Sequence, residues 1–459
     1  MGSEGEKMKK YLALVLSMVF VLGFAASAFA IHAEIPAETT AVVGVKGTEI
    51  QIEGEVRIRG WYEDNITNTA GTANAATGRP YSGTSMAWYD QRVRLAVDVR
   101  TAPNVTGRIH LETEVDPIRG SDAYVWGKTD TAVTGGGVAA GGAKTGDRLS
   151  ILEAWIAYTG TGLLGVTSGI KAGHMPLVIG AGQFYDHRRY GDDAILLFIE
   201  HAKGTEINLV TVKFSEGTIT DNTNDTDAYA LLLTHKLDKD NTIGANYTYV
   251  NNSDAKLSLQ NIGLHAAGKL AGLGYRASAD FQFGDLTSTV KARGYALTAG
   301  VNYKVDPVTL RASFAYGTGD KAGTAKNEQF LAFVGNVINY TAVYEYRVHS
   351  AAGNTGTGLA NTTYYNIGLD WSPVKDLRLA LDYFLLRASK ATAASGYGSD
   401  KEIGSELDLK LSYRIARNLT YFINSGVLFA GDFYKAAGTG PNSDPKNAVV
   451  FHHGLTLSF

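Results

Sequence analysis

Residues Glu406–Ile415 read ELDLKLSYRI, and apolar and polar side chains alternate in this stretch without a break. Side chains of a β-strand point to opposite faces in turn, so one face here carries Leu, Tyr and Ile, and the other carries Glu, Asp, Lys, Ser and Arg. The same period of two recurs in residues 377–385, 92–100 and 451–459. The sequence therefore predicts an all-β protein whose strands have one apolar and one polar face.

Alternation alone does not separate a soluble β-sandwich, whose apolar faces meet inside, from a transmembrane barrel, whose apolar face meets lipid. Three features favour the barrel. The polar faces carry dense charges that look unpaired, the connections alternate between short and long, and the strands end in aromatic residues, as in the girdles of outer-membrane barrels. The aromatic positions are Trp61-Tyr62, Trp88-Tyr89, Tyr247, Tyr249, Tyr364-Tyr365, Trp371 and Phe429.

The pattern predicts a transmembrane antiparallel up-and-down β-barrel of about 18 strands, an even number as in single-chain bacterial barrels. The expected strands are 49–63, 86–101, 104–116, 148–160, 165–174, 193–202, 204–215, 226–238, 241–251, 256–270, 272–285, 291–304, 308–317, 361–372, 376–389, 402–415, 418–431 and 447–459. Such boundaries carry an error of about two to four residues, and about 16 strands is the alternative. Short turns alternate with long loops such as 117–147 and 318–360, which places both termini on the periplasmic side.

A sheet can span a membrane only when every edge is paired, because lipid offers the backbone amides no partner. The strand that ends at Phe459 must therefore pair with the strand that begins near Glu49. A barrel of this strand number is too wide for side chains to fill, and it encloses an aqueous channel unless it is plugged.

The first residues have the features of a targeting segment. Lys7, Lys9 and Lys10 precede an apolar run, Tyr11–Phe24, and Ala28-Phe29-Ala30 follows it. We expect a signal peptide over residues 1–30, of the Sec type, cut before Ile31. A periplasmic N-terminal segment, 31–47, would then lead into the transmembrane barrel, 48–459. An uncleaved N-terminal anchor is the alternative.

The composition excludes several classes of protein and site. The chain has no Cys, which excludes disulfides, thiolate nucleophiles and Fe–S clusters. With 42 Lys and Arg against 45 Asp and Glu, no cationic excess points to nucleic acid. Asp186-His187 has no nucleophile elbow nearby, so we expect no enzyme, no cofactor and no metal site. Asp221–Asp225 resembles calcium-loop chemistry but lacks EF-hand spacing, and a solvated loop tip is the preferred interpretation.

Several short motifs resemble the alginate-export-type outer-membrane porins. They are Ile403–Leu409 (IGSELDL) followed by Tyr413, Ala430–Phe433 (AGDF), Gly173–Gly180 (GHMPLVIG) running on to Asp186–Asp193 (DHRRYGDD), Arg92 with Arg94, and Val125–Gly127 (VWG). The resemblance implies an 18-stranded monomeric barrel with a charged pore, in the outer membrane of a Gram-negative bacterium. Members named for alginate have a strongly electropositive lumen, whereas arginines here are mixed with acids.

Polar faces of the first three strands combine arginines with acids, among them Glu53, Glu55 and Asp98. Two interpretations have equal weight: ion pairs that stiffen the wall, and a selectivity field that orients solutes in a narrow pore. The arginine supply suggests a weak preference for anions. The candidate pore-lining residues are Arg57, Arg59, Arg92, Arg94, Arg108, Glu112, Glu114, Asp186, His187, Arg188, Arg189, Arg276, Arg311, Arg378, Glu406, Asp408 and Arg414.

Two connections are candidates for structure of their own, and the first contains more apolar residues than an exposed loop usually carries. Segment 175–192 mixes Met175, Pro176, Leu177 and Phe184 with charged residues, so we expect it to fold into the lumen as a constriction. Segment 329–348 is either an extra hairpin or an element packed over the mouth.

The expected function is an outer-membrane porin for passive diffusion of small hydrophilic solutes or ions. The alternatives are an export conduit for an anionic polysaccharide and a structural or adhesive barrel with a plugged lumen. The expected partners are outer-membrane lipid and lipopolysaccharide, the transported solutes, and the barrel-assembly machinery, which would recognise the strand that ends in Phe459. A monomer is favoured, with a trimer as the alternative.

Overall fold

The structure is a computed structural model that describes residues 47–66, 85–113, 124–126, 149–161, 165–217, 225–321, 323–333, 340–348, 358–391, 400–435 and 445–459. All of them belong to the second of two units, Met1–Ala41 and Val42–Phe459. The expected signal peptide, Glu114 and the Asp221–Asn224 part of the proposed loop tip lie outside the described residues. No helix in the described part is long and apolar enough to span a membrane.

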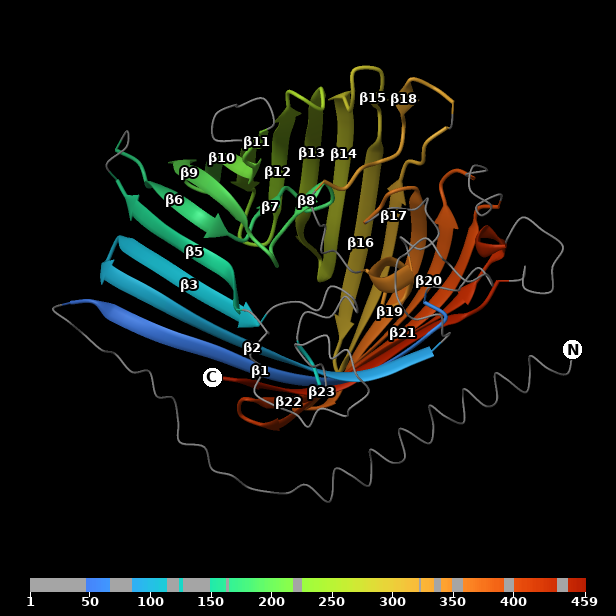
Figure 1. The fold of residues 1–459 in the computed structure, drawn as a ribbon. Coiled ribbons are helices and arrows are strands. Elements are labelled where there is room, and N and C mark those ends of the chain that lie inside the picture. Colours follow the sequence, from blue (N-terminus) through green and yellow to red (C-terminus); the bar gives the residue numbers. More distant parts are fainter. Residues whose placement is uncertain are drawn as a thin grey trace, which may run out of the picture. The chain divides into compact units, whose positions relative to one another are not determined.

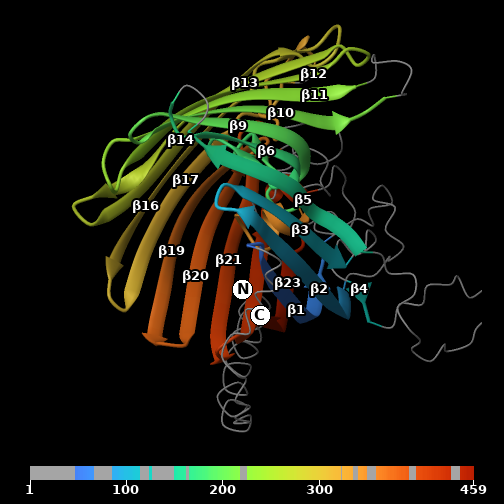
Figure 2. The same ribbon diagram turned by 90° about the vertical axis from the view of Figure 1, so that its left-hand side faces the viewer.

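In the described residues, 18 strands form the wall of a closed antiparallel barrel, as the alternation predicts (Figures 1 and 2). They are β1 Glu49–Asp64, β2 Ser85–Ala102, β3 Val105–Thr113, β5 Leu149–Gly160, β6 Ser168–Met175, β9 Asp192–Ala202, β10 Thr205–Ser215, β11 Thr226–Lys236, β12 Thr242–Asn252, β13 Leu257–Leu270, β14 Leu273–Asp285, β16 Tyr295–Val305, β17 Val308–Gly317, β19 Thr362–Val374, β20 Leu377–Ala388, β21 Glu402–Ala416, β22 Leu419–Ala430 and β23 Ala448–Ser458.

Closure is made between the first and last strands. β1 pairs antiparallel with β23 from Glu55 opposite Ser458 to Asp64 opposite Val449. Beyond that ladder, the N–H of Gly54 donates to the carbonyl of Phe459 at 2.7 Å, and the N–H of Phe459 donates back at 3.0 Å. The backbone N–H and C=O groups at the edges of the first and last strands are thus paired with each other, as a sheet in lipid requires.

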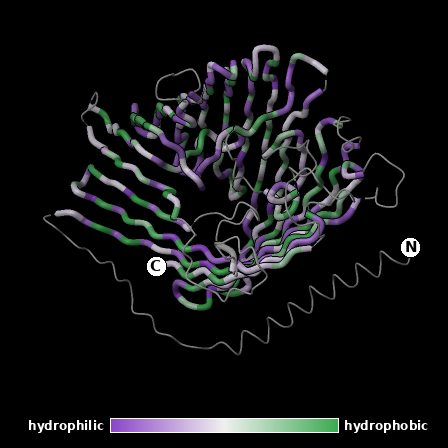
Figure 3. The backbone as a smooth tube through the Cα atoms, in the orientation of Figure 1, coloured by the Kyte–Doolittle hydropathy of each residue, from purple (hydrophilic) through white to green (hydrophobic). Residues whose placement is uncertain are grey.

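Hydropathy alternates along the wall strands (Figure 3), and many of their large apolar side chains, such as Leu231, Leu233 and Ile367, are exposed on the outside. The aromatic pairs of the sequence are split by this alternation, because consecutive residues of a strand face opposite ways. Tyr62 and Tyr89 are exposed on the outside, whereas Trp61 and Trp88 are buried and stack on each other at a centroid distance of 5.5 Å. The prediction that both members of each pair belong to a girdle was therefore wrong for Trp61, Trp88 and the buried Tyr364.

One predicted strand is shorter than the sequence suggests. β16 begins at Tyr295 rather than at residue 291, and Lys291–Ala292 forms a separate strand, β15. β15 still pairs with β14, where Lys291 lies opposite Asp285, and on its other side it pairs in parallel with β18, Lys326–Asn327, of the following loop. The barrel wall and a folded loop meet at this place.

Two connections carry structure of their own. Insert A, residues 176–191 between β6 and β9, contains β7, Val178–Ile179, paired with β8, Tyr185–Asp186. Figure 1 shows β7 and β8 inside the curve of the wall. Insert B, residues 318–361 between β17 and β19, contains β18 and a π-helix, Tyr344–Val348. Residues 334–339 and 349–357 of insert B lie outside the described part.

Two short elements complete the described secondary structure. β4, Tyr124–Val125, pairs with β2, and a 3₁₀ turn, Asp432–Tyr434, follows β22.

Candidate functional site: the charged inner wall

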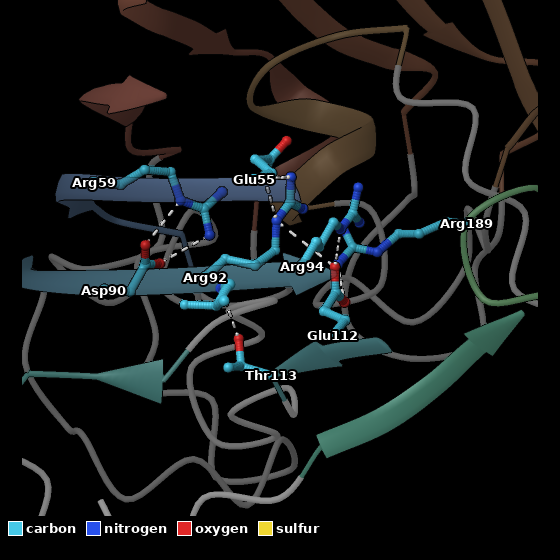
Figure 4. A network of polar contacts seen from close by, with 9 residues as sticks. Glu55, Arg59, Asp90, Arg92, Arg94, Glu112, Thr113 and Arg189 are labelled. Atoms are coloured by element: carbon cyan, nitrogen blue, oxygen red, sulfur yellow. Dashed lines mark hydrogen bonds and ion pairs between the residues drawn. The ribbon is translucent and has the colours of Figure 1, made fainter. Parts of the chain in front are cut away.

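Arginines and acids of β1, β2 and β3 form ion pairs and hydrogen bonds on the inner wall (Figure 4). Arg59 donates to both carboxylate oxygens of Asp90, from Nε and Nη2, at 2.9 Å each. Arg92 donates to Glu55 from Nε at 2.9 Å and from Nη2 at 2.5 Å. Such two-point guanidinium–carboxylate contacts fix orientation as well as charge.

Glu112 on β3 is the centre of this network. Its carboxylate accepts a hydrogen bond from Nε of Arg94 at 2.5 Å and one from Nη2 of Arg189 at 3.3 Å. Nε of Arg92 lies 3.6 Å from the same carboxylate. Three guanidinium groups therefore share one carboxylate that is itself only 2 % exposed. Figure 4 shows Arg94 and Arg189 approaching Glu112 from different segments of the chain.

A second network lies farther along the same strands. Arg108 donates to Asp98 at 2.6 Å, to Glu53 at 3.1 Å and to Glu153 at 3.2 Å. Nδ1 of His110 lies 3.0 Å from an oxygen of Glu153. Each strand of β1, β2, β3 and β5 thus contributes a charged side chain.

The charges that look unpaired in the sequence are paired in the fold. The physical reason is register: Arg59 lies opposite Asp90, and Asp98 lies opposite Arg108, on the same face of neighbouring strands. Arg57 lies opposite Arg92 and is half-buried on that face. The sequence missed Asp90 and Glu153 as partners, although their parity within β2 and β5 was a usable signal.

The arginines on the later strands have a different setting. Arg311 donates to Asp370 at 2.8 Å and to both oxygens of Asp382 at 2.8 and 2.9 Å. Arg378 reaches Asp370 at 3.4 Å and is 68 % exposed. Arg414 donates from Nε to Asp376, in a short turn, at 2.7 Å. Arg276 is exposed on the inner face of β14 and makes no ion pair with any residue that the structure describes.

Insert A packs against the inner wall. Phe184 and Tyr185 in it are buried, at 1 % and 0 % exposure, and Gly180 lies so close to Asn246 of β12 that a Cβ at Gly180 would be 2.1 Å from the amide oxygen. At its other end Arg189 reaches Glu112. Insert A therefore extends along the inside from β3 to β12.

The charged residues of insert A mostly bind one another. Nε of Arg188 donates to Asp186 at 2.8 Å, and Nδ1 of His187 lies 2.8 Å from Asp192. The Tyr185 hydroxyl donates to Asp192 at 2.6 Å, and burial, reinforced by this carboxylate, raises the pKa of Tyr185. Of the predicted residues of this segment, Arg189 is the one that joins the network of the wall.

Insert B is held by two carboxylates of β21. Glu406 accepts the backbone N–H groups of Val343 at 2.6 Å and Tyr344 at 2.8 Å, and Asp408 accepts that of Ala342 at 2.9 Å. Glu406 and Asp408 are 0 % and 2 % exposed. Both were expected to face the water of the pore; instead they are covered by insert B, whose amides occupy their oxygens.

The two inserts touch each other inside the barrel. The N–H of Phe333 in insert B donates to the carbonyl of Phe184 in insert A at 2.8 Å. Both rings pack together, at 6.1 Å, and Phe214 of β10 approaches Phe333 at 5.2 Å. The described parts of the two inserts thus contact the inner wall at β3, β10, β12 and β21.

The barrel is similar to solved outer-membrane barrels of Pseudomonas aeruginosa. OccK9 (OpdG) matches with a TM-score of 0.56 at 11% identity, over 89% of this chain and 98% of that one. The outer membrane protein opdK matches with 0.55 at 10%, over 89% and 99%. OccK8 (OprE) matches with 0.53 at 11%, over 89% and 98%. At this identity the likeness shows the fold alone, and no curated protein matches the chain.

A family model described as alginate export matches residues 49–446, which is nearly the whole barrel. Fold and family together place the protein in the bacterial outer membrane, as expected from the sequence. The resemblance carried by the motifs around Ile403–Leu409 and Gly173–Gly180 is confirmed: the chain belongs to the alginate export family.

Proposed function

We propose that the protein is a channel for passive diffusion of small hydrophilic solutes, with a weak preference for anions. The protein is an outer-membrane β-barrel with the fold of channel proteins. The observation that carries the proposal is the arrangement around Glu112, where three arginines share one buried carboxylate.

The anion preference follows from which of these charges meet water. The side chains of Arg94 and Arg189 are 23 % and 21 % exposed, whereas Glu112 is 2 % exposed. Glu55, at 23 %, is the exposed acid of this group. A solute that passes Arg94 and Arg189 therefore meets more positive than negative charge. Fixed charges of one sign on a narrow aqueous path weight permeability toward the opposite sign.

Inserts A and B support a size limit on the solutes. They cover the inner faces of β10 to β12 and of β21, and they are tied together at Phe184 and Phe333. A barrel of this strand number would otherwise leave a wide aqueous lumen. The remaining path suits small solutes better than folded or bulky ones.

Export of an anionic polysaccharide is the second candidate, because the matching family is described as alginate export. A polyanion needs a continuous track of free cationic groups. Arg59, Arg92 and Arg108 are instead engaged by acids, and Arg311 is held by Asp370 and Asp382. These pairs favour small solutes over a polymer.

Liposome swelling tests the proposal. Vesicles that contain the refolded protein should swell in isotonic solutions of a neutral monosaccharide. Their swelling rate should be higher in the corresponding uronate, which is an anion, than in a cationic sugar of equal size. Arg94→Gln with Arg189→Gln should remove the difference between the charged sugars and keep the neutral rate, whereas Arg100→Gln, at an exposed pair with Glu49, should change neither. Absence of swelling in every sugar, or equal rates for both charged sugars in the unaltered protein, would overturn it.

A further inference from the structure

The inner wall of β12, β13 and β14 carries a cluster of polar side chains that are buried. Asn246 and Asp280 are each 5 % exposed, and Thr248 and Asn261 are 0 % exposed. We refer to these four residues as the Asn246 cluster. None of them belongs to the networks around Glu112 or Arg108.

Strand register brings the cluster together. Asn246 of β12, Gly263 of β13 and Asp280 of β14 lie side by side in one row, and Thr248 lies opposite Asn261. Gly263 leaves room between its neighbours: a Cβ there would be 2.4 Å from Oδ1 of Asn246 and 2.9 Å from Oδ1 of Asp280. Nδ2 of Asn261 donates to the same Asp280 oxygen at 2.9 Å. Oδ1 of Asn246 and Oδ1 of Asp280 therefore both lie beside the space that a side chain at Gly263 would fill, with Asn261 and Thr248 in the adjacent row.

Insert A covers this place. Gly180 has a φ of 61° and lies directly over Asn246, where no side chain would fit between them. A group held above Gly263 is thus separated from the open lumen by the insert.

The cluster has unused hydrogen-bonding capacity. Both side-chain polar atoms of Asn246, Oγ1 of Thr248 and Oδ1 of Asn261 are buried without a hydrogen-bond partner in the described structure. Asp280 makes no ion pair with any described residue. Buried polar groups without partners are costly, and a buried carboxylate without a counter-charge is more so. Three of the four unpartnered atoms are oxygens, and Asp280 adds a carboxylate, so the arrangement favours a positively charged ligand that oxygen atoms can coordinate.

We propose that the Asn246 cluster binds a monovalent hard cation of the Na⁺ or K⁺ class. The amide oxygens of Asn246 and Asn261, the hydroxyl of Thr248 and the carboxylate of Asp280 are all oxygen donors, which hard cations prefer. One carboxylate balances one positive charge, so a monovalent ion leaves the buried site neutral. The bound ion also pins insert A, because Gly180 closes the site from above.

Diffraction from crystals of the full-length mature protein grown with thallium(I) acetate, as a probe for K⁺, tests the site directly. The expected result is an anomalous peak between Asn246 and Asp280. The peak should disappear when excess K⁺ replaces the thallium ion. Asp280→Asn should lose the peak. Asp285→Asn, which removes an exposed carboxylate at the end of the same strand, should keep it. No peak at the cluster, or density there that is water alone, overturns the proposal.

A second measurement does not depend on crystals. The melting temperature of the detergent-solubilised protein should be higher in KCl or NaCl than in N-methylglucamine chloride at equal ionic strength. The shift should persist in Asp285→Asn and vanish in Asp280→Asn. Equal melting temperatures of the unaltered protein in all three salts would contradict a bound cation. Neither measurement depends on solute transport, so failure of the proposed channel function leaves this test intact.

Discussion

The buried carboxylate of Glu406 accepts the backbone N–H of Val343 at 2.6 Å, and this bond joins the wall to insert B. The neighbouring N–H of Tyr344 donates to the other oxygen of Glu406 at 2.8 Å. A wall residue thus holds the beginning of the π-helix by both oxygens. The position of insert B inside the barrel depends on this side chain.

Glu406→Gln should loosen insert B. The amide nitrogen of glutamine cannot accept a hydrogen bond, so at least one of the two bonds to Val343 and Tyr344 is lost. A buried N–H that loses its acceptor costs about 1–3 kcal/mol, and the anchoring of the insert should weaken by about that amount. Single-channel recordings should show more current flicker and a higher mean conductance. Glu402→Gln, at an exposed position of the same strand, is the control, and identical traces for the two variants would refute the anchoring role.

Glu112→Gln should raise the preference for anions. It removes the negative charge that Arg92, Arg94 and Arg189 share; Arg92 keeps its pair with Glu55, whereas the positive charges of Arg94 and Arg189 are no longer offset by this carboxylate. Breaking a buried pair in this way typically costs about 3–5 kcal/mol, so the variant should also melt at a lower temperature. The reversal potential in a KCl gradient should move toward the chloride potential. An unchanged or opposite shift would show that these arginines do not face the ion path.

Removal of residues 181–189 from insert A should raise the single-channel conductance. The deleted stretch contains Phe184, Tyr185 and Arg189, which fix the insert to Phe333 and Glu112. The wall strands on both sides, β6 and β9, stay paired through their own ladder. A variant that folds, as judged by its heat-modifiable migration on gels, and conducts like the unaltered protein would show that insert A does not narrow the path.

The order of insert B should depend on pH through Glu345. Burial raises the pKa of the Glu345 carboxyl well above its ordinary value of 4.5, and the N–H of Gly358, 3.3 Å away, offsets this only in part. Because the pKa in the folded insert is raised, the protonated form is the one the fold favours. The contribution of the protonated Glu345 carboxyl to the stability of the insert is fully present below pH 4.5. It is lost as the pH rises through the pKa that Glu345 has in the folded protein.

Hydrogen exchange of the amides of residues 342–348, corrected for intrinsic rates, measures this effect. Protection should fall as the pH rises from 4.5, and Glu345→Gln should flatten the dependence. Glu328→Gln, in the same insert but 40 % exposed and paired with Lys390, is the control. If the protection of these amides still depends on pH in Glu345→Gln, another titrating group causes the effect.

The barrel could be predicted from the sequence because its determinant is local. The period of two assigns each residue of a strand to a face, and the lipid face requires apolar residues at every second position. That rule identified Glu112, Arg94 and Arg108 as inner-wall residues, and it yielded 18 strands with errors of a few residues at their ends. The wrong predictions, such as the assignment of Trp61 to the aromatic girdle, placed two consecutive residues on the same face of a strand.

The contacts between distant segments could not be predicted in the same way. Arg189 meets Glu112 across 77 positions of the chain, and Val343 meets Glu406 across 63. Such pairs depend on the path of a loop through three dimensions, which no periodicity encodes. The apolar content of segment 175–192 indicated that it folds into the lumen, whereas segment 329–348 was left open between a hairpin and an element packed over the mouth; the partners of both segments are visible only in the fold.

The reversal potential of single channels in a planar bilayer, under a KCl gradient, tests the central claim most directly. The refolded barrel should insert in discrete steps. Its reversal potential should lie between zero and the equilibrium potential of chloride, because both ions permeate and chloride permeates more readily. A clearly cation-selective current, or a bilayer that stays silent although the folded barrel has inserted, would contradict a solute channel governed by Arg94 and Arg189.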